Sequence, residues 1–565
     1  MRIIEKLTSV ILLSGFCWMN ANCTASKAPT APAAKPQEIQ TPQEKLVRML
    51  PIRSDQDFAI VFTSSVQGNV KPCGCTADPL GGIARIASVM QGLRKHYKDQ
   101  LLFLDTGDLL FEKTSVRPAV EKCQDDARIE LLLSTFKDLG LAHTLRGPRD
   151  LAAGNDAYED WMNDHQIHHA AMPVVSTIQK VGTQDIGLLA LLPDEAMSLT
   201  QRQEALDGAL ETMKKQRVAQ VIVMSQLPLQ LLRQLSWNTY PVTAILQGHE
   251  SGEAPQKPQR LNADGPYILF NGIQGQYLGV LHFSWKPDDL KSKLQPDLSF
   301  FEVDADKKLL QLRIEGLEKR MQGARVSKQQ KQFFQGRIAS AVKRLHELKS
   351  LSPALPNEAV LRLFSWSIRQ EIEPLEGVAS AVKAYEDQIP ALVAQCESGM
   401  ECELPEEGDA VYVGVQTCVS CHKAAVQQWR GALIEGQKSK SGKIGHAKAW
   451  QTLEELHKTR DRQCVGCHSV GFNEPGGYCK TDQVGFLENV QCESCHGPGS
   501  LHAQTGDPSL IMKEVPQEAC RECHHVPHIE SYASFDYNEK LKIILGPGHG
   551  EKKWRTLMGN TKIDH

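Results

Sequence analysis

Cys418-Val-Ser-Cys-His422 is the first of four copies of the pattern Cys-x-x-Cys-His in the last third of this 565-residue chain. The other copies begin at Cys464, Cys492 and Cys520. This pattern is typical of c-type haem attachment, in which both thiols form thioether bonds to the porphyrin and the adjacent histidine binds the iron. Four copies so close together exclude a chance origin. They predict four covalently bound haem c groups.

The predicted attachment residues are Cys418, Cys421, Cys464, Cys467, Cys492, Cys495, Cys520 and Cys523, and the predicted proximal iron ligands are His422, His468, His496 and His524. Zinc is the competing interpretation, because paired cysteines also bind zinc tetrahedrally, but structural zinc needs no histidine directly after every pair. Thioredoxin-like redox motifs share the spacing and occur singly at the start of a helix. The repeated histidine therefore favours haem.

The motif spacing indicates that the haems lie close together. The first cysteines of successive motifs are 46, 28 and 28 residues apart, which is too few for independent haem domains. The second axial ligand decides what each iron does: a second imidazole favours outer-sphere electron transfer, and an open face admits a small molecule. The candidate second ligands are His446, His457, His502, His525, His528 and His549.

Composition and the N-terminal segment bear on the class and location of the protein. The net charge of −4 and the 41% hydrophobic content suit a globular protein and give no basic excess for binding nucleic acid. Residues 1–25 contain a short basic region and an apolar stretch, Leu7–Phe16, and predict a cleaved export signal rather than a membrane span. Residues 26–50 predict a flexible linker. We expect a periplasmic location, and Cys17 and Cys23 leave a lipid anchor open.

Three further regions follow from the hydrophobic pattern. Residues 55–305 alternate short apolar runs with amphipathic segments, which predicts an α/β domain. Its predicted buried strands are Phe58–Thr63, Leu101–Leu104, Val221–Met224 and Val242–Leu246. Residues 306–400 are dense in helix formers, interrupted at Pro353 and Pro356, and predict a helical connector. Residues 405–565 hold the haem motifs and predict a mostly helical and irregular domain.

Two motifs follow predicted strands of the α/β region, Leu104-Asp-Thr-Gly-Asp-Leu109 and Gly248-His-Glu-Ser251. With them, the region resembles the calcineurin-like metallophosphoesterases of the 5′-nucleotidase branch, a sandwich fold that binds two metal ions. The resemblance implies that Asp108 and His249 are retained metal ligands. The other ligand positions carry Ser65, Gln67, Pro148, Arg149, Gln226 and Ser251.

Amide and hydroxyl groups substitute poorly for imidazole on a transition metal, and without a metal pair no water is activated. We therefore expect a degenerate site without phosphoesterase catalysis. The frame then serves docking, shapes a redox site, or only packs against the haem domain.

The cysteines outside the haem motifs suggest disulfide bonds in an exported protein. Cys73-Gly-Cys75 is interpreted as a redox pair, a metal clip or part of two structural disulfides, one of them with Cys123. Cys396 and Cys402 flank a short turn, which predicts a local disulfide. The sequence leaves open whether Cys479 is a thiol or a disulfide partner.

Three C-terminal segments carry a second resemblance: Tyr412-Val-Gly-Val-Gln-Thr-Cys418, Gly445-His-Ala-Lys-Ala-Trp450 and Val490-Gln-Cys-Glu-Ser-Cys-His-Gly-Pro-Gly-Ser-Leu-His502. On these, residues 411–550 resemble the multihaem cytochrome c-554/c-prime family. The resemblance implies that His446 and His502 are distal ligands. His528 is similar to a position after the last motif of the family.

The remaining histidines are judged from their sequence context. His549 lies in a turn that can fold back over a haem. His525 directly follows a proximal ligand and can reach only a neighbouring haem. His457, beside a charged stretch, is expected at the surface.

Together these features predict an exported tetrahaem c-type cytochrome that transfers electrons between a donor and an acceptor protein. The alternative is a redox enzyme acting on a small nitrogen or sulfur species at a five-coordinate haem. A haem-regulated phosphoesterase and an interaction protein are further rivals.

Overall fold

The structure is a computed structural model, and its description covers residues 50, 52, 54–72, 79–115, 118–248, 255–263, 265–285, 295–297, 314, 317–318, 321, 328–350, 360–431, 446–481, 485–524, 537–546 and 549–558. The predicted export signal and nearly all of the predicted linker lie outside these residues. Within them, no helix combines the length and the hydropathy that a membrane span requires.

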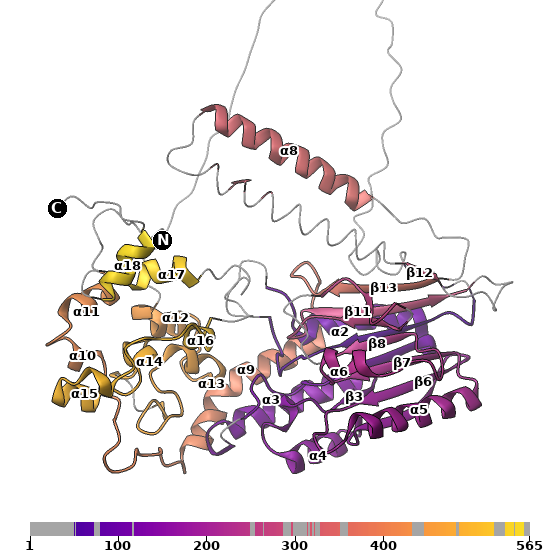
Figure 1. Cartoon of the computed structure of the whole chain (residues 1–565), viewed down its shortest axis with the longest axis horizontal. Coiled ribbons are helices and arrows are strands. Elements are labelled where there is room, and N and C mark those ends of the chain that lie inside the picture. Colours follow the sequence, from indigo (N-terminus) through magenta and orange to yellow (C-terminus); the bar gives the residue numbers. More distant parts are fainter. Residues whose placement is uncertain are drawn as a thin grey trace, which may run out of the picture. The chain divides into compact units, whose positions relative to one another are not determined.

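Two β-sheets form the core of the α/β region (Figure 1). In spatial order, the first sheet contains β12 (Gln295–Asp297), β13 (Val360–Ser367), β11 (Tyr277–Ser284), β1 (Phe58–Thr63), β2 (Leu101–Asp105), β3 (Leu141–Leu145) and β4 (His168–Ala170). The second contains β5 (Val174–Val181), β6 (Gln184–Leu191), β7 (Gln220–Ser225), β8 (Ala244–Gln247), β10 (Tyr267–Phe270) and β9 (Gln259–Arg260). All four strands predicted from apolar runs are present, as β1, β2, β7 and β8.

The two sheets face each other across a shared apolar layer. Phe62 from β1 and Leu281 from β11 belong to the same buried cluster as Ile222 from β7 and Leu246 from β8. Because side chains alternate along a strand, the neighbouring residue Val61 points to the opposite face of the first sheet and joins a different cluster. Both faces of this sheet are therefore buried, which explains the continuous apolar runs in the sequence.

Helices cover the two outer faces. The first sheet packs against α2 (Ile83–Tyr97), α3 (Pro118–Asp138) and α9 (Glu376–Glu397), and the second against α5 (Leu199–Gln216) and α6 (Leu229–Gln234). In α2 the buried residues Ile83, Ile86, Met90, Leu93 and Tyr97 recur at helical spacing, which fixes the face that meets the sheet. The short helix α4 (Asn155–Asp164) precedes β4. These layers confirm the predicted α/β sandwich.

The predicted helical connector is partly wrong. It contains α8 (Lys328–Ser350) and α9, but between them lies the strand β13, which pairs antiparallel with β11 and parallel with β12. Leu361 and Leu363 enter the layer between the sheets, whereas Phe364 packs in the outer cluster. Apolar residues lie on both faces of this strand and the polar Arg362 is buried among them, so the strand lacks the strict alternation that identifies most strands. The prediction therefore missed it.

The haem-motif region consists of short helices and loops. They are α10 (Val415–Cys418), α11 (Lys423–Arg430), α12 (Ala449–Glu455), α13 (Arg462–Val465), α14 (Glu493–His496), α15 (Ser500–Thr505), α16 (Gln517–Arg521), α17 (Tyr537–Ile544) and α18 (Glu551–Met558). Its protein core is small, with Trp450, Leu453, Val465, Val470, Tyr478 and Leu487 as the buried members. This agrees with the predicted mostly helical and irregular fold.

Candidate haem centre

Each Cys-x-x-Cys-His motif lies on or beside a short helix. In three motifs the backbone N–H of the histidine donates to the carbonyl of the first cysteine. These distances are 2.9 Å for His422 to Cys418, 3.0 Å for His496 to Cys492 and 2.8 Å for His524 to Cys520. Such a bond closes one α-helical turn and brings the first thiol and the imidazole to the same side of the helix. The second motif instead runs from α13 into a 3₁₀ turn, Gly466–His468.

Disulfide bonding separates the motif cysteines from four others. All eight motif cysteines lie outside disulfide bonds. The disulfides of the described residues join Cys123 to Cys396 and Cys402 to Cys479. The predicted local disulfide between Cys396 and Cys402 is therefore wrong, because each residue pairs with a cysteine distant in sequence, and Cys123 is not a partner of Cys73 or Cys75. The latter two residues lie outside the described ranges.

Three predicted proximal histidines face a second histidine. The ring centroids are separated by 6.0 Å for His422 and His502, 5.9 Å for His524 and His446, and 6.1 Å for His496 and His549. A metal binds an imidazole nitrogen at about 2.0 Å, so two rings on opposite sides of one ion have centroids roughly 6 Å apart. All three pairs therefore fit an iron between two imidazoles. The structure brings together the predicted distal ligands His446, His502 and His549 with three different motifs.

Backbone carbonyls orient several of these imidazoles through Nδ1. The Nδ1 atoms lie 2.6 Å from the carbonyl oxygen of Met512 for His496, 2.9 Å from that of Asp507 for His502 and 3.0 Å from that of Ile544 for His549. His468 Nδ1 lies 2.5 Å from the carbonyl oxygen of Ala449. A carbonyl only accepts, so Nδ1 donates and carries the proton, which leaves the Nε2 lone pair for a metal. This is the tautomer that an iron ligand needs.

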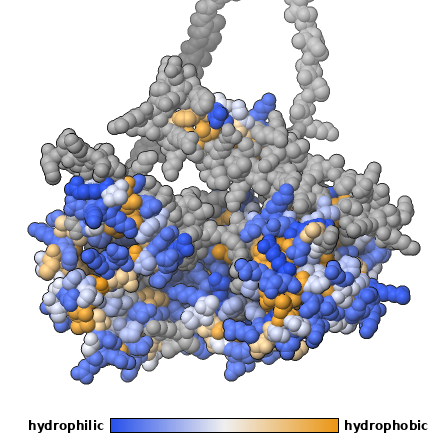
Figure 2. Space-filling view, viewed as in Figure 1, coloured by the Kyte–Doolittle hydropathy of each residue, from blue (hydrophilic) through white to orange (hydrophobic). Residues whose placement is uncertain are grey.

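Other features of the region also fit a porphyrin. Met512, whose carbonyl contacts His496, is 48% exposed, and Ile543, the neighbour of the residue whose carbonyl contacts His549, is 63% exposed. Figure 2 shows apolar patches among the hydrophilic surface over the C-terminal elements. A haem face covers apolar side chains of this kind. Burial also lowers the pKa of His446, which favours its neutral, metal-binding form.

The remaining histidine predictions have different outcomes. His457 is exposed, in agreement with the prediction, and its backbone has a left-handed φ of 55°. His525 and His528 lie outside the described residues, so the prediction of His528 as a distal ligand stays a prediction.

The four motifs contact one another. The thiols of Cys418 in the first motif and Cys492 in the third lie close enough to interact electrostatically. The thiols of Cys467 in the second motif and Cys523 in the fourth lie equally within electrostatic reach of each other. Cys495 of the third motif also lies within electrostatic reach of the fourth. The four motifs therefore form one connected cluster.

The model of the family described as cytochrome c554 and c-prime matches residues 417–497. Cytochrome c-554 of Nitrosomonas europaea is 37% identical over 186 aligned residues, which cover 24% of this chain and 74% of that cytochrome. The chain belongs to the cytochrome c-554 family.

As a member of the cytochrome c-554 family, the chain is a multihaem c-type cytochrome that functions in electron transfer. Its haem c groups are covalently bound. The geometry agrees with this, because the paired imidazoles and the cysteines outside disulfides supply the bonds that this cofactor needs. The matched residues include the first three motifs, and the fourth follows at Cys520.

The α/β region of this cytochrome holds Asp108 in an ion pair. Asp108 is 2% exposed and has a left-handed φ of 55°. Its Oδ2 lies 2.8 Å from Nη1 of Arg149, and its Oδ1 accepts a hydrogen bond of 2.8 Å from the Arg149 backbone N–H. Arg149 thus puts a fixed positive charge against the carboxylate that the resemblance assigned to a metal. The other retained position, His249, lies outside the described residues.

Two more buried carboxyl groups lie beside this ion pair. Asp150 accepts backbone hydrogen bonds from Asp108, Leu110 and Gly147 at 2.8, 2.9 and 2.8 Å. Burial and the neighbouring Asp108 nevertheless raise the pKa of Asp150 to about 8. Burial likewise raises the pKa of Asp105 to about 6. Among the described residues, no group of three histidine, cysteine or carboxylate side chains is arranged to hold a metal ion.

Solved structures similar to this chain include phosphoesterases. A 5′-nucleotidase precursor from Thermus thermophilus has a TM-score of 0.39 and 14% identity, and the match covers 63% of this chain and 61% of that structure, less than two thirds of its length. A calcineurin-like phosphoesterase from Bacillus subtilis has a TM-score of 0.37 and 14% identity, and the match covers 60% of this chain and 99% of that structure.

Sequence reasoning missed which distal histidine serves which motif. It also missed the carbonyl groups of Ala449, Met512 and Ile544, because a backbone acceptor leaves no signature in residue type. It also missed that α3 and α9 contact the second motif, although the charged residues Lys458, Asp461 and Arg462 just before Cys464 indicate a polar contact there.

Proposed function

We propose that this chain is an exported tetrahaem cytochrome that relays electrons between redox partner proteins in the periplasm. The observation that carries the proposal is the set of three histidine pairs, each with centroids about 6 Å apart. Two imidazoles close both faces of an iron and favour outer-sphere electron transfer. The contacts between the motifs support a relay, because they bring all four attachment sites into one cluster.

The residues of the chain have separate tasks in this proposal. The eight motif cysteines hold four haems, and His422, His468, His496 and His524 bind the irons from the proximal side. His502, His549 and His446 close three of them. Bound haem c supplies a one-electron Fe(III)/Fe(II) couple. The backbone carbonyl groups fix the tautomer and the direction of the imidazoles that they contact, which limits reorganisation when the charge changes.

Intact mass spectrometry and a CO titration of the reduced protein test the proposal together. The expected results are a mass that includes four covalent haems and no CO-sensitive change at the three paired sites. A smaller haem number contradicts the tetrahaem assignment. CO binding by most of the haems contradicts the relay and favours the alternative, a redox enzyme acting on a small nitrogen or sulfur species.

We further propose that the α/β region has no phosphoesterase activity and serves as support or docking surface. The Arg149–Asp108 pair supports this, because a guanidinium group already compensates the carboxylate charge and no metal is needed there. The test is hydrolysis of p-nitrophenyl phosphate with added Mn²⁺. We expect the rate to equal that of the Arg149→Ala variant and of buffer alone. Hydrolysis that only the wild type accelerates contradicts the proposal.

A further inference from the structure

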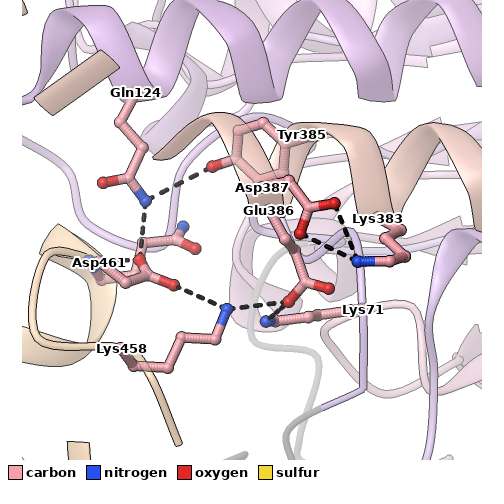
Figure 3. A network of polar contacts seen from close by, with 9 residues as sticks. Lys71, Gln124, Lys383, Tyr385, Glu386, Asp387, Lys458 and Asp461 are labelled. Carbon is pink, nitrogen blue, oxygen red and sulfur yellow. Dashed lines mark hydrogen bonds and ion pairs between the residues drawn. The ribbon is translucent and has the colours of Figure 1, made fainter. Parts of the chain in front are cut away.

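Helix α3 of the α/β region contacts the residues directly before the second haem motif. Asp461 is the N-cap of α13, and its carboxylate accepts a hydrogen bond of 3.2 Å from the Gln463 N–H. The side chain of Gln124 in α3 donates to the same carboxylate oxygen at 2.7 Å. It also accepts a hydrogen bond of 3.0 Å from the Arg462 N–H. One buried amide thus binds both Asp461 and Arg462, and Figure 3 shows its contact with the Asp461 carboxylate.

Helix α9 makes a second set of contacts with the same segment. Lys458 Nζ lies 2.8 Å from the Glu386 carboxylate of α9 and 3.5 Å from that of Asp461. Glu386 also pairs with Lys71, so it bridges two lysines (Figure 3). The Glu386 carboxylate therefore links α9 both to Lys71 of the α/β region and to Lys458 before the second haem motif.

The third contact is a buried ion pair. Arg462 Nη1 lies 3.3 Å from Oε1 of Glu397 at the end of α9, and the side chains are 4% and 12% exposed. The guanidinium also donates to the carbonyl oxygen of Cys479 at 2.8 Å and to Oδ1 of Asn473 at 2.7 Å. Arg462 is two residues from Cys464, so this charge pair lies beside the second haem attachment site.

Two disulfide bonds fix this arrangement. Cys123, next to Gln124 in α3, is bonded to Cys396, next to Glu397 in α9. Cys479, whose carbonyl accepts from Arg462, is bonded to Cys402. The residues that contact the motif segment are thus adjacent to covalent cross-links.

We propose that α3 and α9 tune the haem attached at Cys464–His468, and that Arg462 and Glu397 are the positioning residues that set its reduction potential. The inference rests on the proposed function, because it requires a haem at the second motif. It gives the α/β region a use beyond support: the region holds a charge pair against one haem of the relay.

The sign of the effect follows from electrostatics. Ferric haem carries one more positive charge than ferrous haem, so a nearby cation stabilises the reduced form and a nearby anion the oxidised form. Removing the Glu397 charge leaves Arg462 with Glu121 as an acidic neighbour but without its ion-pair partner, and raises the potential. Removing the Arg462 charge leaves Glu397 uncompensated and lowers it. Glu397 also lines a cavity of about 1100 Å³, so added salt is expected to weaken both shifts.

EPR-monitored redox titration of full-length holoprotein tests the inference with Glu397→Gln and Arg462→Gln. Glutamine keeps a carbonyl that can accept from Thr481, which now donates to Glu397 at 3.1 and 2.9 Å. We expect one haem to shift in opposite directions in the two variants. The expected change is up to tenfold in the one-electron equilibrium constant, which equals about 59 mV. Arg462→Lys, which keeps the charge, should restore most of the wild-type potential.

The control is Asp387→Asn, which breaks an exposed ion pair with Lys383 on the same helix and should shift no haem. Unchanged potentials in Glu397→Gln overturn the inference, even if Arg462→Gln fails to fold. Equal shifts of the same sign in both variants also overturn it, because a loss of packing has no charge dependence. A holoprotein mass that lacks a haem at the second motif refutes the proposed function instead.

Discussion

Replacing Gln124 by alanine removes the amide that links α3 to the second haem motif. The variant loses a hydrogen bond to the Asp461 carboxylate, which is 4% exposed, and leaves the Arg462 N–H without its acceptor. A hydrogen bond to a charged group is worth about 1.5–3 kcal/mol, and an unsatisfied buried donor costs about 1–3 kcal/mol. Since the two effects overlap, we expect a loss of roughly 3 kcal/mol in the local stability of this contact.

Hydrogen exchange measured by mass spectrometry detects this loss directly. The amides of Cys464 and Val465 donate to the Asp461 carbonyl, and their exchange should become about a hundredfold faster, because each 1.4 kcal/mol is a factor of ten. The matched control is Gln203→Ala in α5. Gln203 also bonds a carboxylate, that of Asp207, and a backbone amide, but it is partly exposed, so water replaces its partners. Unchanged exchange at residues 461–468 in Gln124→Ala would refute the reasoning.

Two further predictions concern the α/β region. Arg149→Met should lower the free energy of unfolding of this region by about 2 kcal/mol, because it leaves the Asp108 carboxylate buried without its cation. Chemical denaturation measures the loss, and adding Asp108→Asn should recover most of it. Because the pKa of Asp150 rises from 3.8 in the unfolded chain to about 8, the folded state retains a proton that the unfolded chain releases. The free energy of unfolding should therefore fall as the pH rises from 3.8 to about 8 and level off at higher pH. In Asp150→Asn this fall should be less steep. A steeper fall in that variant would contradict the assignment.

Local patterns in the sequence predicted the strands of the sheets that are short apolar runs, and the attachment cysteines and proximal histidines of the haem motifs. The four haem motifs are contiguous, so they identify attachment cysteines and proximal histidines directly. The strands β1, β2, β7 and β8 are short apolar runs between polar turns, which residue type alone reveals. The strand β13 was missed because its apolar residues do not alternate strictly, so that only its pairing with β11 identifies it as a strand.

Long-range pairings limited the remaining predictions. The Cys123–Cys396 disulfide joins residues 273 positions apart, and no local spacing indicates it. His446 was predicted as a distal ligand, but its proximity to His524 rather than to the nearer motif at His468 depends on how the loops fold. The degenerate phosphoesterase site was predicted from missing ligands. Only the structure shows that Arg149, one of the substituted residues, binds the retained Asp108.

Low-temperature EPR of the ferric holoprotein tests most directly whether a second imidazole closes the haem irons. The His502→Ala and His549→Ala variants are compared with wild type. If these residues close haem irons as proposed, each variant gains a high-spin signal from one haem while the other haems keep their spectra. The exposed residue His457 provides the control, and His457→Ala should leave the spectrum unchanged. Low-spin spectra identical to wild type in both distal variants would contradict the paired-imidazole relay.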